Sequence, residues 1–173
     1  WRDFAEGMDL PHNFPGVMGL GYGMYLRADQ RDPTEKDIRN QGYEDFHIWS
    51  NNQGADTGSS VVVMYLEPFA GRNLRAFGYD MLSEPTRRAA LLQAARSGAP
   101  ALTAKVELVQ NDDNTGLPGF LMYFPIYHKD SRLGPDSTPV QRMAALQGFA
   151  YSPIRADELM RDLLGPADHT VRV

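Results

Sequence analysis

Two stretches in the second half of the chain decide the fold: G-F-L-M-Y-F-P-I-Y (residues 119–127) and Q-G-F-A-Y-S-P-I (residues 147–154). Aromatic and β-branched residues are frequent in both, and such residues favour β-strands. Residues 103–110, where apolar and charged residues alternate in part, predict another strand just before them. Strands that follow one another along the chain favour an antiparallel sheet with helices packed on it. The sequence therefore predicts an α+β fold.

Three earlier segments predict further strands. The strongest is S-V-V-V-M-Y-L (residues 60–66), which contains three consecutive β-branched valines. Residues 16–27 hold four glycines among apolar residues, which indicates a buried strand that another backbone approaches closely. Residues 46–49 predict a short strand.

Capping signals predict where the helices begin and end. Asp32, before Pro33, is typical of an N-cap, and Gly42 would end that helix. Ser83 predicts the N-cap of a second helix, which Gly98 would close. Further helices are expected at residues 1–10, stopped by the prolines that follow, and at residues 156–164.

Composition excludes several classes of protein. The 173 residues suffice for one ordinary domain or two small sub-domains. The net charge of −5 gives no basic surface, so we expect no nucleic-acid partner. The absence of cysteine excludes a disulfide scaffold, a thiol nucleophile and a thiolate zinc site.

The chain carries no clear signal of catalysis or of metal binding. No two of its four histidines lie within four residues of each other, and no G-x-S-x-G motif is present. The glycines of G-L-G-Y-G (residues 19–23) lack the spacing of a phosphate-binding loop and favour a packing role. Residues 112–114, D-D-N, fit a solvated turn better than a calcium loop. We therefore expect neither an enzyme nor a cofactor or metal site.

Seven motifs, taken in order, resemble the CHASE domain. This family is the extracytoplasmic sensor module of membrane histidine kinases, diguanylate cyclases and related bacterial receptors, and of the plant cytokinin receptors. The motifs cover nearly the whole chain: F-P-G-V-M-G-L-G-Y (14–22), V-V-V-M-Y-L-E-P (61–68), G-R-N (71–73), G-Y-D-M-L-S-E-P-T-R-R-A-A-L (78–91), A-L-T (101–103), G-F-L-M-Y-F-P-I-Y (119–127) and G-F-A-Y-S-P-I-R-A-D-E-L-M (148–160).

The resemblance implies an architecture with a long N-terminal stalk helix and two PAS-like halves built on antiparallel sheets. Residues 1–13 would be the end of a mostly absent stalk. Residues 14–128 would form the membrane-distal, ligand-binding half, and residues 129–173 an incomplete membrane-proximal half. The resemblance also implies flanking membrane spans outside this chain and a periplasmic location.

The resemblance also points to site residues. In the plant members an aspartate in a D-M-x-S segment binds an adenine-type ligand, and this position matches Asp80. A leucine of an L-T pair contributes main-chain contacts and matches Leu102, beside Thr103. We expect Asp80 and Leu102 to line one cavity that takes a purine-like molecule. From the residues alone a second role for Asp80 stays open, namely capping of the helix start near Ser83.

The expected function is a non-catalytic, small-molecule-sensing domain of a membrane receptor with a histidine kinase or diguanylate cyclase output. The ligand would be purine- or cytokinin-like, and the full-length receptor would be a homodimer anchored in the membrane through the flanking segments. One alternative is a sensor module that binds a protein and no small ligand. Another, a stand-alone enzyme, would require a clustered nucleophile and base, which the sequence does not show.

Overall fold

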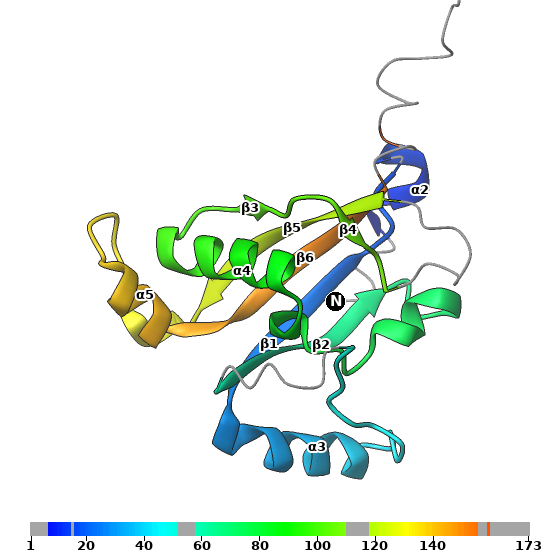
Figure 1. Ribbon diagram of the computed structural model, residues 1–173, viewed down its shortest axis with the longest axis horizontal. Coiled ribbons are helices and arrows are strands. Elements are labelled where there is room, and N and C mark those ends of the chain that lie inside the picture. Colours follow the sequence, from blue (N-terminus) through cyan, green and yellow to red (C-terminus); the bar gives the residue numbers. More distant parts are fainter. Residues whose placement is uncertain (1–6, 15, 52–57, 110–117, 156–158, 160–173) are drawn as a thin grey trace, which may run out of the picture.

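The computed structural model describes residues 7–14, 16–51, 58–109, 118–155 and 159 (Figure 1). These residues form one antiparallel sheet of six strands in the order β2-β1-β6-β5-β3, with β4 also paired to β5. Helices lie over one face of the sheet and at its ends (Figure 1). The predicted α+β class is therefore confirmed.

Four long strands make up most of the sheet: β1 (Leu20–Arg27), β2 (Ser59–Glu67), β5 (Pro118–Tyr127) and β6 (Leu146–Arg155). The two stretches that decided the prediction, β5 and β6, pair along their length, with Tyr123 opposite Tyr151. β6 also pairs with β1. β5 and β6 lie on either side of the boundary expected between residues 128 and 129, and they are neighbours in the sheet.

The strand predicted over residues 103–110 is much shorter in the structure. Two short strands stand in this region, β3 (Ala101–Leu102) and β4 (Val106–Glu107), and both pair with β5. The strand predicted at residues 46–49 is wrong, because that segment makes only an isolated bridge between Trp49 and Tyr79.

Four α-helices are described: α2 (Leu10–Asn13), α3 (Arg31–Asn40), α4 (Pro85–Ser97) and α5 (Pro139–Ala144). Short 3-10 helices add η1 (Ala28–Gln30), η2 (Gly71–Ala76), η3 (Met81–Ser83) and η4 (Lys129–Ser131). The helix predicted at residues 1–10 lies mostly outside the described residues, as do the helix at residues 156–164 and a strand expected at residues 170–173. Residues 8–9 form a turn, and Pro11 lies in the first turn of α2, which follows.

Two predicted caps are wrong by one or two residues. The N-cap of α3 is Gln30, so Asp32 lies in the first turn. The N-cap of α4 is Glu84, because its carboxylate, and not the Ser83 hydroxyl, accepts from the free N–H groups of the first turn. Pro85 in the first turn and Gly98 as the C-cap are confirmed.

The sequence analysis missed α5 entirely. Thr138 and Gln141 form a capping box at its start, and Pro139 occupies the first turn. A helix of six residues is too short to show a helical period in the sequence.

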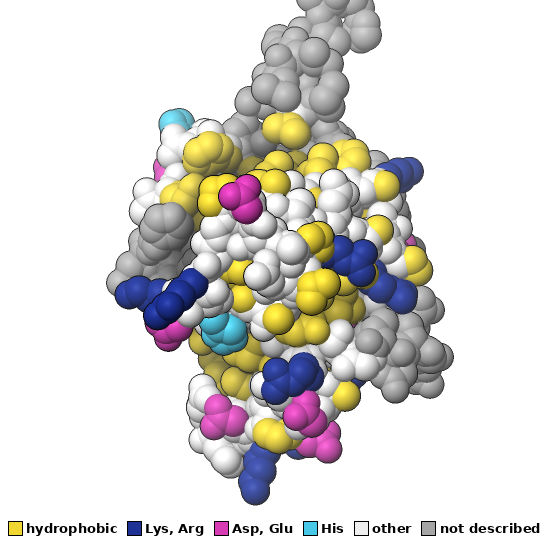
Figure 2. Space-filling model, turned by 90° about the vertical axis from the view of Figure 1, so that its left-hand side faces the viewer, with side chains coloured by type: hydrophobic (Ala, Val, Ile, Leu, Met, Phe, Trp, Pro, Cys, Tyr) yellow, Lys and Arg dark blue, Asp and Glu magenta, His cyan; other side chains and the backbone are white. Residues whose placement is uncertain are grey.

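The main core lies between the sheet and α4, which runs across one face (Figure 1). Tyr123 and Phe149 of the sheet and Leu91 of α4 belong to one cluster of buried side chains. The expected close approach along residues 16–27 is confirmed, since a Cβ on Gly19 would collide with the backbone carbonyl of Glu67. The left-hand side of the molecule carries Lys and Arg side chains interspersed with Asp and Glu, so its described part shows no continuous basic area (Figure 2).

Candidate ligand-binding site

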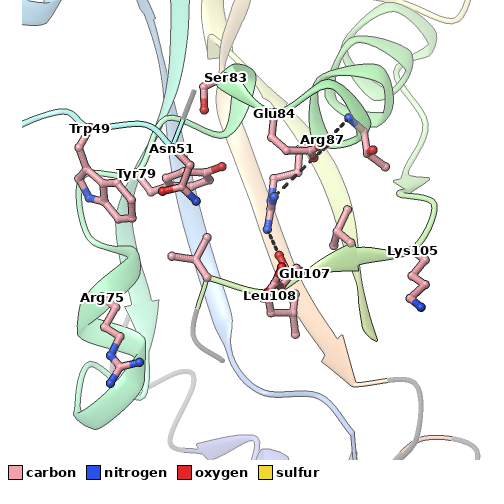
Figure 3. Close-up of a pocket in the computed structure, with 13 residues that line it drawn as sticks. Trp49, Asn51, Arg75, Tyr79, Ser83, Glu84, Arg87, Lys105, Glu107 and Leu108 are labelled. Carbon is pink, nitrogen blue, oxygen red and sulfur yellow. Dashed lines mark hydrogen bonds and ion pairs between the residues drawn. The ribbon is translucent and has the colours of Figure 1, made fainter. Parts of the chain in front are cut away.

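A cavity of about 580 Å³ opens between η2, η3, the start of α4 and the segment around β4 (Figure 3). Its volume lies within the range of small-molecule sites. The lining residues come from three stretches that are distant in sequence (49–51, 75–87 and 105–109): Trp49, Asn51, Arg75, Tyr79, Ser83, Glu84, Thr86, Arg87, Lys105, Val106, Glu107, Leu108 and Val109.

Two aromatic rings form one wall of this cavity. The centroids of Trp49 and Tyr79 lie 4.9 Å apart, with the ring planes tilted by 57°. The Trp49 indole is fixed because its Nε1–H donates to the Phe77 carbonyl at 2.9 Å. The main chain of Trp49 also bonds Gly78. Glycine is required there, since its φ is +81° and a Cβ would collide with the His47 carbonyl.

Arg87 joins three parts of the site. Its side chain is buried, and its Nη2 donates to the Glu107 carbonyl at 2.6 Å. Its Nη1 lies 3.4 Å from Glu84 Oε2, and its Cζ lies 5.4 Å from the centre of the Tyr79 ring. The guanidinium therefore links α4 to β4 and to the aromatic wall (Figure 3).

Glu84 sets the position of Arg87. Its two carboxylate oxygens accept from the backbone N–H groups of Thr86 and Arg87, each at 2.8 Å. Burial alone would raise the pKa of the Glu84 carboxyl, but these two N–H groups and the Arg87 charge hold it below its ordinary value. Glu84 is thus an ionised N-cap that starts α4 at the cavity.

Asp80 is buried, but it does not line this cavity. Its Oδ1 accepts from the backbone N–H groups of Val61 and Leu82, both at 3.0 Å, and its own carbonyl accepts from the Ser83 hydroxyl. Asp80 therefore caps η3 and ties it to β2. Of the two roles left open by the sequence, the capping role is the one visible in these contacts.

Leu102 and Thr103 also lie outside the cavity lining. Leu102 is 51% exposed, and Thr103 is buried with its Oγ1 accepting from the N–H of Leu121 at 3.0 Å. The structure thus does not bring Asp80 and Leu102 to this cavity. It does bring Tyr79 and Ser83, the neighbours of Asp80, to its wall.

Sequence reasoning missed Trp49 and Arg87, which form much of the site. The sequence predicts Trp49 in a short strand, and it places Arg87 beside a second arginine in a predicted helix, with nothing that distinguishes the two. A signal existed for Arg87, because the S-E-P-T-R order places it within the first turn after an N-cap glutamate. No group of three or more His, Asp or Glu side chains suited to a metal ion occurs among the described residues.

We expect Asp80→Ala to lower the free energy of unfolding by about 2–4 kcal/mol, because two buried N–H groups lose a charged acceptor. Asp80→Asn keeps an oxygen acceptor and should cost less. Asp136→Ala, in an exposed turn, is the control and should change stability little. Urea unfolding of the unliganded proteins measures all three. An Asp80→Ala variant as stable as the control would show that the capping role is negligible.

We also expect the stabilisation by Glu84 to depend on pH. A carboxyl whose pKa is lowered on folding stabilises above its unfolded pKa, and this contribution is lost as the pH falls through the folded pKa. Glu84→Gln should therefore be less stable than the wild type by about 1 kcal/mol near neutral pH. The difference should vanish in acid. Urea unfolding across this pH range tests it, and a pH-independent difference would contradict an ionised cap.

A comparison with models of known protein families matches a stretch of the chain that includes the sheet and the cavity. The model of the CHASE domain matches residues 1–173, which is the whole chain. A search of curated proteins gave no match. None of the described helices has the length and apolar character needed to cross a membrane. The resemblance noted in the sequence is thereby confirmed: the chain belongs to the CHASE domain family, the extracellular sensor domains of signalling receptors.

Proposed function

We propose that this domain senses a small molecule in the cavity between η3, α4 and β4, on behalf of a membrane receptor. The single observation that carries the proposal is the cavity itself, which combines ligand size, an aromatic wall and a buried guanidinium. The sensor role of the CHASE family supports it. The receptor's output would be a histidine kinase or a diguanylate cyclase.

Arg87 offers a route by which ligand binding changes the domain. Its bond to the Glu107 carbonyl joins α4 to β4 across the cavity. A ligand that draws the guanidinium towards itself weakens this bond and favours a second arrangement of β4. Such a ligand shifts the equilibrium between the two arrangements by its difference in affinity for them.

We further propose that the described sheet is the ligand-binding half of a two-half CHASE architecture, and that receptors pair through a stalk helix before residue 1. Homodimers would then depend on that helix. Light scattering should find this 173-residue chain monomeric or weakly dimeric, and a chain extended upstream stably dimeric. A tight dimer of the short chain would place the interface in the sheet domain instead.

The purine-like ligand and its contacts with Asp80, Leu102 and Thr103 stay predictions. Both described hydrogen bonds to the Asp80 carboxylate use Oδ1, so Oδ2 is the oxygen that can accept a bond from a ligand. A ligand N–H could therefore bind Oδ2 without breaking the cap. Because Asp80 lies outside the cavity lining, such a contact requires η3 to move.

A protein-sensing module is the second candidate function, and one observation favours it. The sheet face opposite α4 carries exposed aromatic side chains, with Phe124 42% and Tyr65 54% exposed. Tyr65 lies beside Tyr22 of the neighbouring strand, with ring centroids 6.5 Å apart. Exposed apolar groups of this kind occur at protein interfaces.

Filling the cavity separates the two functions. Asn51 is exposed and lines the cavity, so Asn51→Trp should block it with little loss of stability. A small molecule that raises the melting temperature of the wild type should then fail to do so for the variant. Asn40→Trp, at the exposed end of α3, is the matched control and should keep the effect. An equal rise in melting temperature for Asn51→Trp and Asn40→Trp would show that the small molecule binds outside this cavity.

A further inference from the structure

The charged groups around the cavity indicate which chemical class of ligand it takes. Three cationic residues line it, Arg75, Arg87 and Lys105, together with two acidic ones, Glu84 and Glu107. Glu84 is already bound by two backbone N–H groups and by Arg87. The side chain of Glu107 belongs to an exposed residue, and it is its carbonyl that meets Arg87.

Arg87 has hydrogen-bonding capacity left for a ligand. A guanidinium carries five N–H donors. Among the described residues, its contacts use one donor to the Glu107 carbonyl and one, at 3.4 Å, to Glu84. The long second bond is weak by the usual geometric criteria. Donors on Nε, Nη1 and Nη2 thus remain for an acceptor inside the cavity.

Lys105 supplies a second cation at the rim. It is exposed, and its ammonium group makes no hydrogen bond or ion pair with another described residue. Arg75 also lines the cavity, but it has a partner of its own. Arg87 is therefore the main cation that a ligand can engage, and Lys105, whose side chain points away from Arg87 in Figure 3, is a second one at the rim that can turn towards a ligand.

We propose that the cavity binds a small molecule with a flat, unsaturated body and a single carboxylate. The carboxylate lies on Arg87, with Lys105 at the rim, and the flat body lies against Trp49 and Tyr79. A planar guanidinium matches a carboxylate in two parallel hydrogen bonds, and burial strengthens them. This inference rests on the proposed small-molecule function and adds the ligand class, an acid in place of a neutral purine.

The test uses three probes: benzoate, its neutral analogue benzamide, and adenine. The chain has two tryptophans, so the indole N–H of Trp49 gives one of two signals in a proton–nitrogen NMR spectrum, and Trp49→Phe identifies it. Benzoate should shift this signal in a saturable way. Benzamide should bind at least about tenfold more weakly, because it lacks the charge that Arg87 and Lys105 recognise.

Variants of the two cations complete the test. Lys105→Gln should weaken benzoate binding about fivefold and leave benzamide unchanged. Lys36→Gln removes the same charge from an exposed site on α3 and is the matched control. Arg87→Gln could unfold the site, since Arg87 joins α4 to β4. Arg87→Lys keeps the charge but cannot donate two parallel hydrogen bonds to a carboxylate. It should therefore also lower the affinity for benzoate more than that for benzamide.

Three outcomes would overturn this inference. Equal binding of benzoate and benzamide would show that the charge is not recognised. Binding of adenine but not of benzoate at Trp49 would favour the neutral purine class and leave small-molecule sensing intact. No response of Trp49 to any probe would reject the acid class, while the Asn51→Trp comparison decides separately whether the cavity binds small molecules at all.

Discussion

The rest of the site is built around the buried carboxylate of Asp80, which accepts a hydrogen bond from β2 at the open edge of the sheet. β2 is an edge strand, and its unpaired N–H groups need partners. Asp80 Oδ1 takes the Val61 N–H, and the main chain of residues 78–80 pairs with β2 and with Trp49. This pairing fixes Tyr79 and Trp49 side by side. The aromatic wall of the cavity therefore rests on these main-chain bonds, and the buried carboxylate of Asp80 reinforces them without itself lining the cavity.

The second constraint is the start of α4. Because Glu84 caps the helix, Arg87 falls in its first turn, at the end of the helix that faces β4. From there its guanidinium reaches the Glu107 carbonyl, twenty positions further along the chain. A cap that satisfies local backbone groups thus also determines where the main cation of the site stands.

The sheet could be predicted from the sequence, whereas most of the site could not. β2, β5 and β6 have continuous apolar and aromatic runs that need no tertiary information, and their bounds differ from prediction by one or two residues. Family resemblance predicts a ligand contact for Asp80, but the role of this residue depends on whether its side chain turns towards β2 or towards a ligand. That choice is made by a bond to Val61, nineteen residues away, which no local pattern reveals.

β4, a strand with little backbone pairing, is in contact with Arg87, the buried cation of the site. β4 has two residues and pairs with β5 at Gly119 and Pro118, and proline has no N–H to donate to the ladder. The bond from Arg87 is therefore a large part of what holds Glu107 in place. A ligand acid that competes for Arg87 acts on the strand with the least backbone pairing to resist it. β4 pairs with β5, and β5 pairs along its length with β6, so backbone hydrogen bonds join the strand that Arg87 contacts to the strand at residues 146–155.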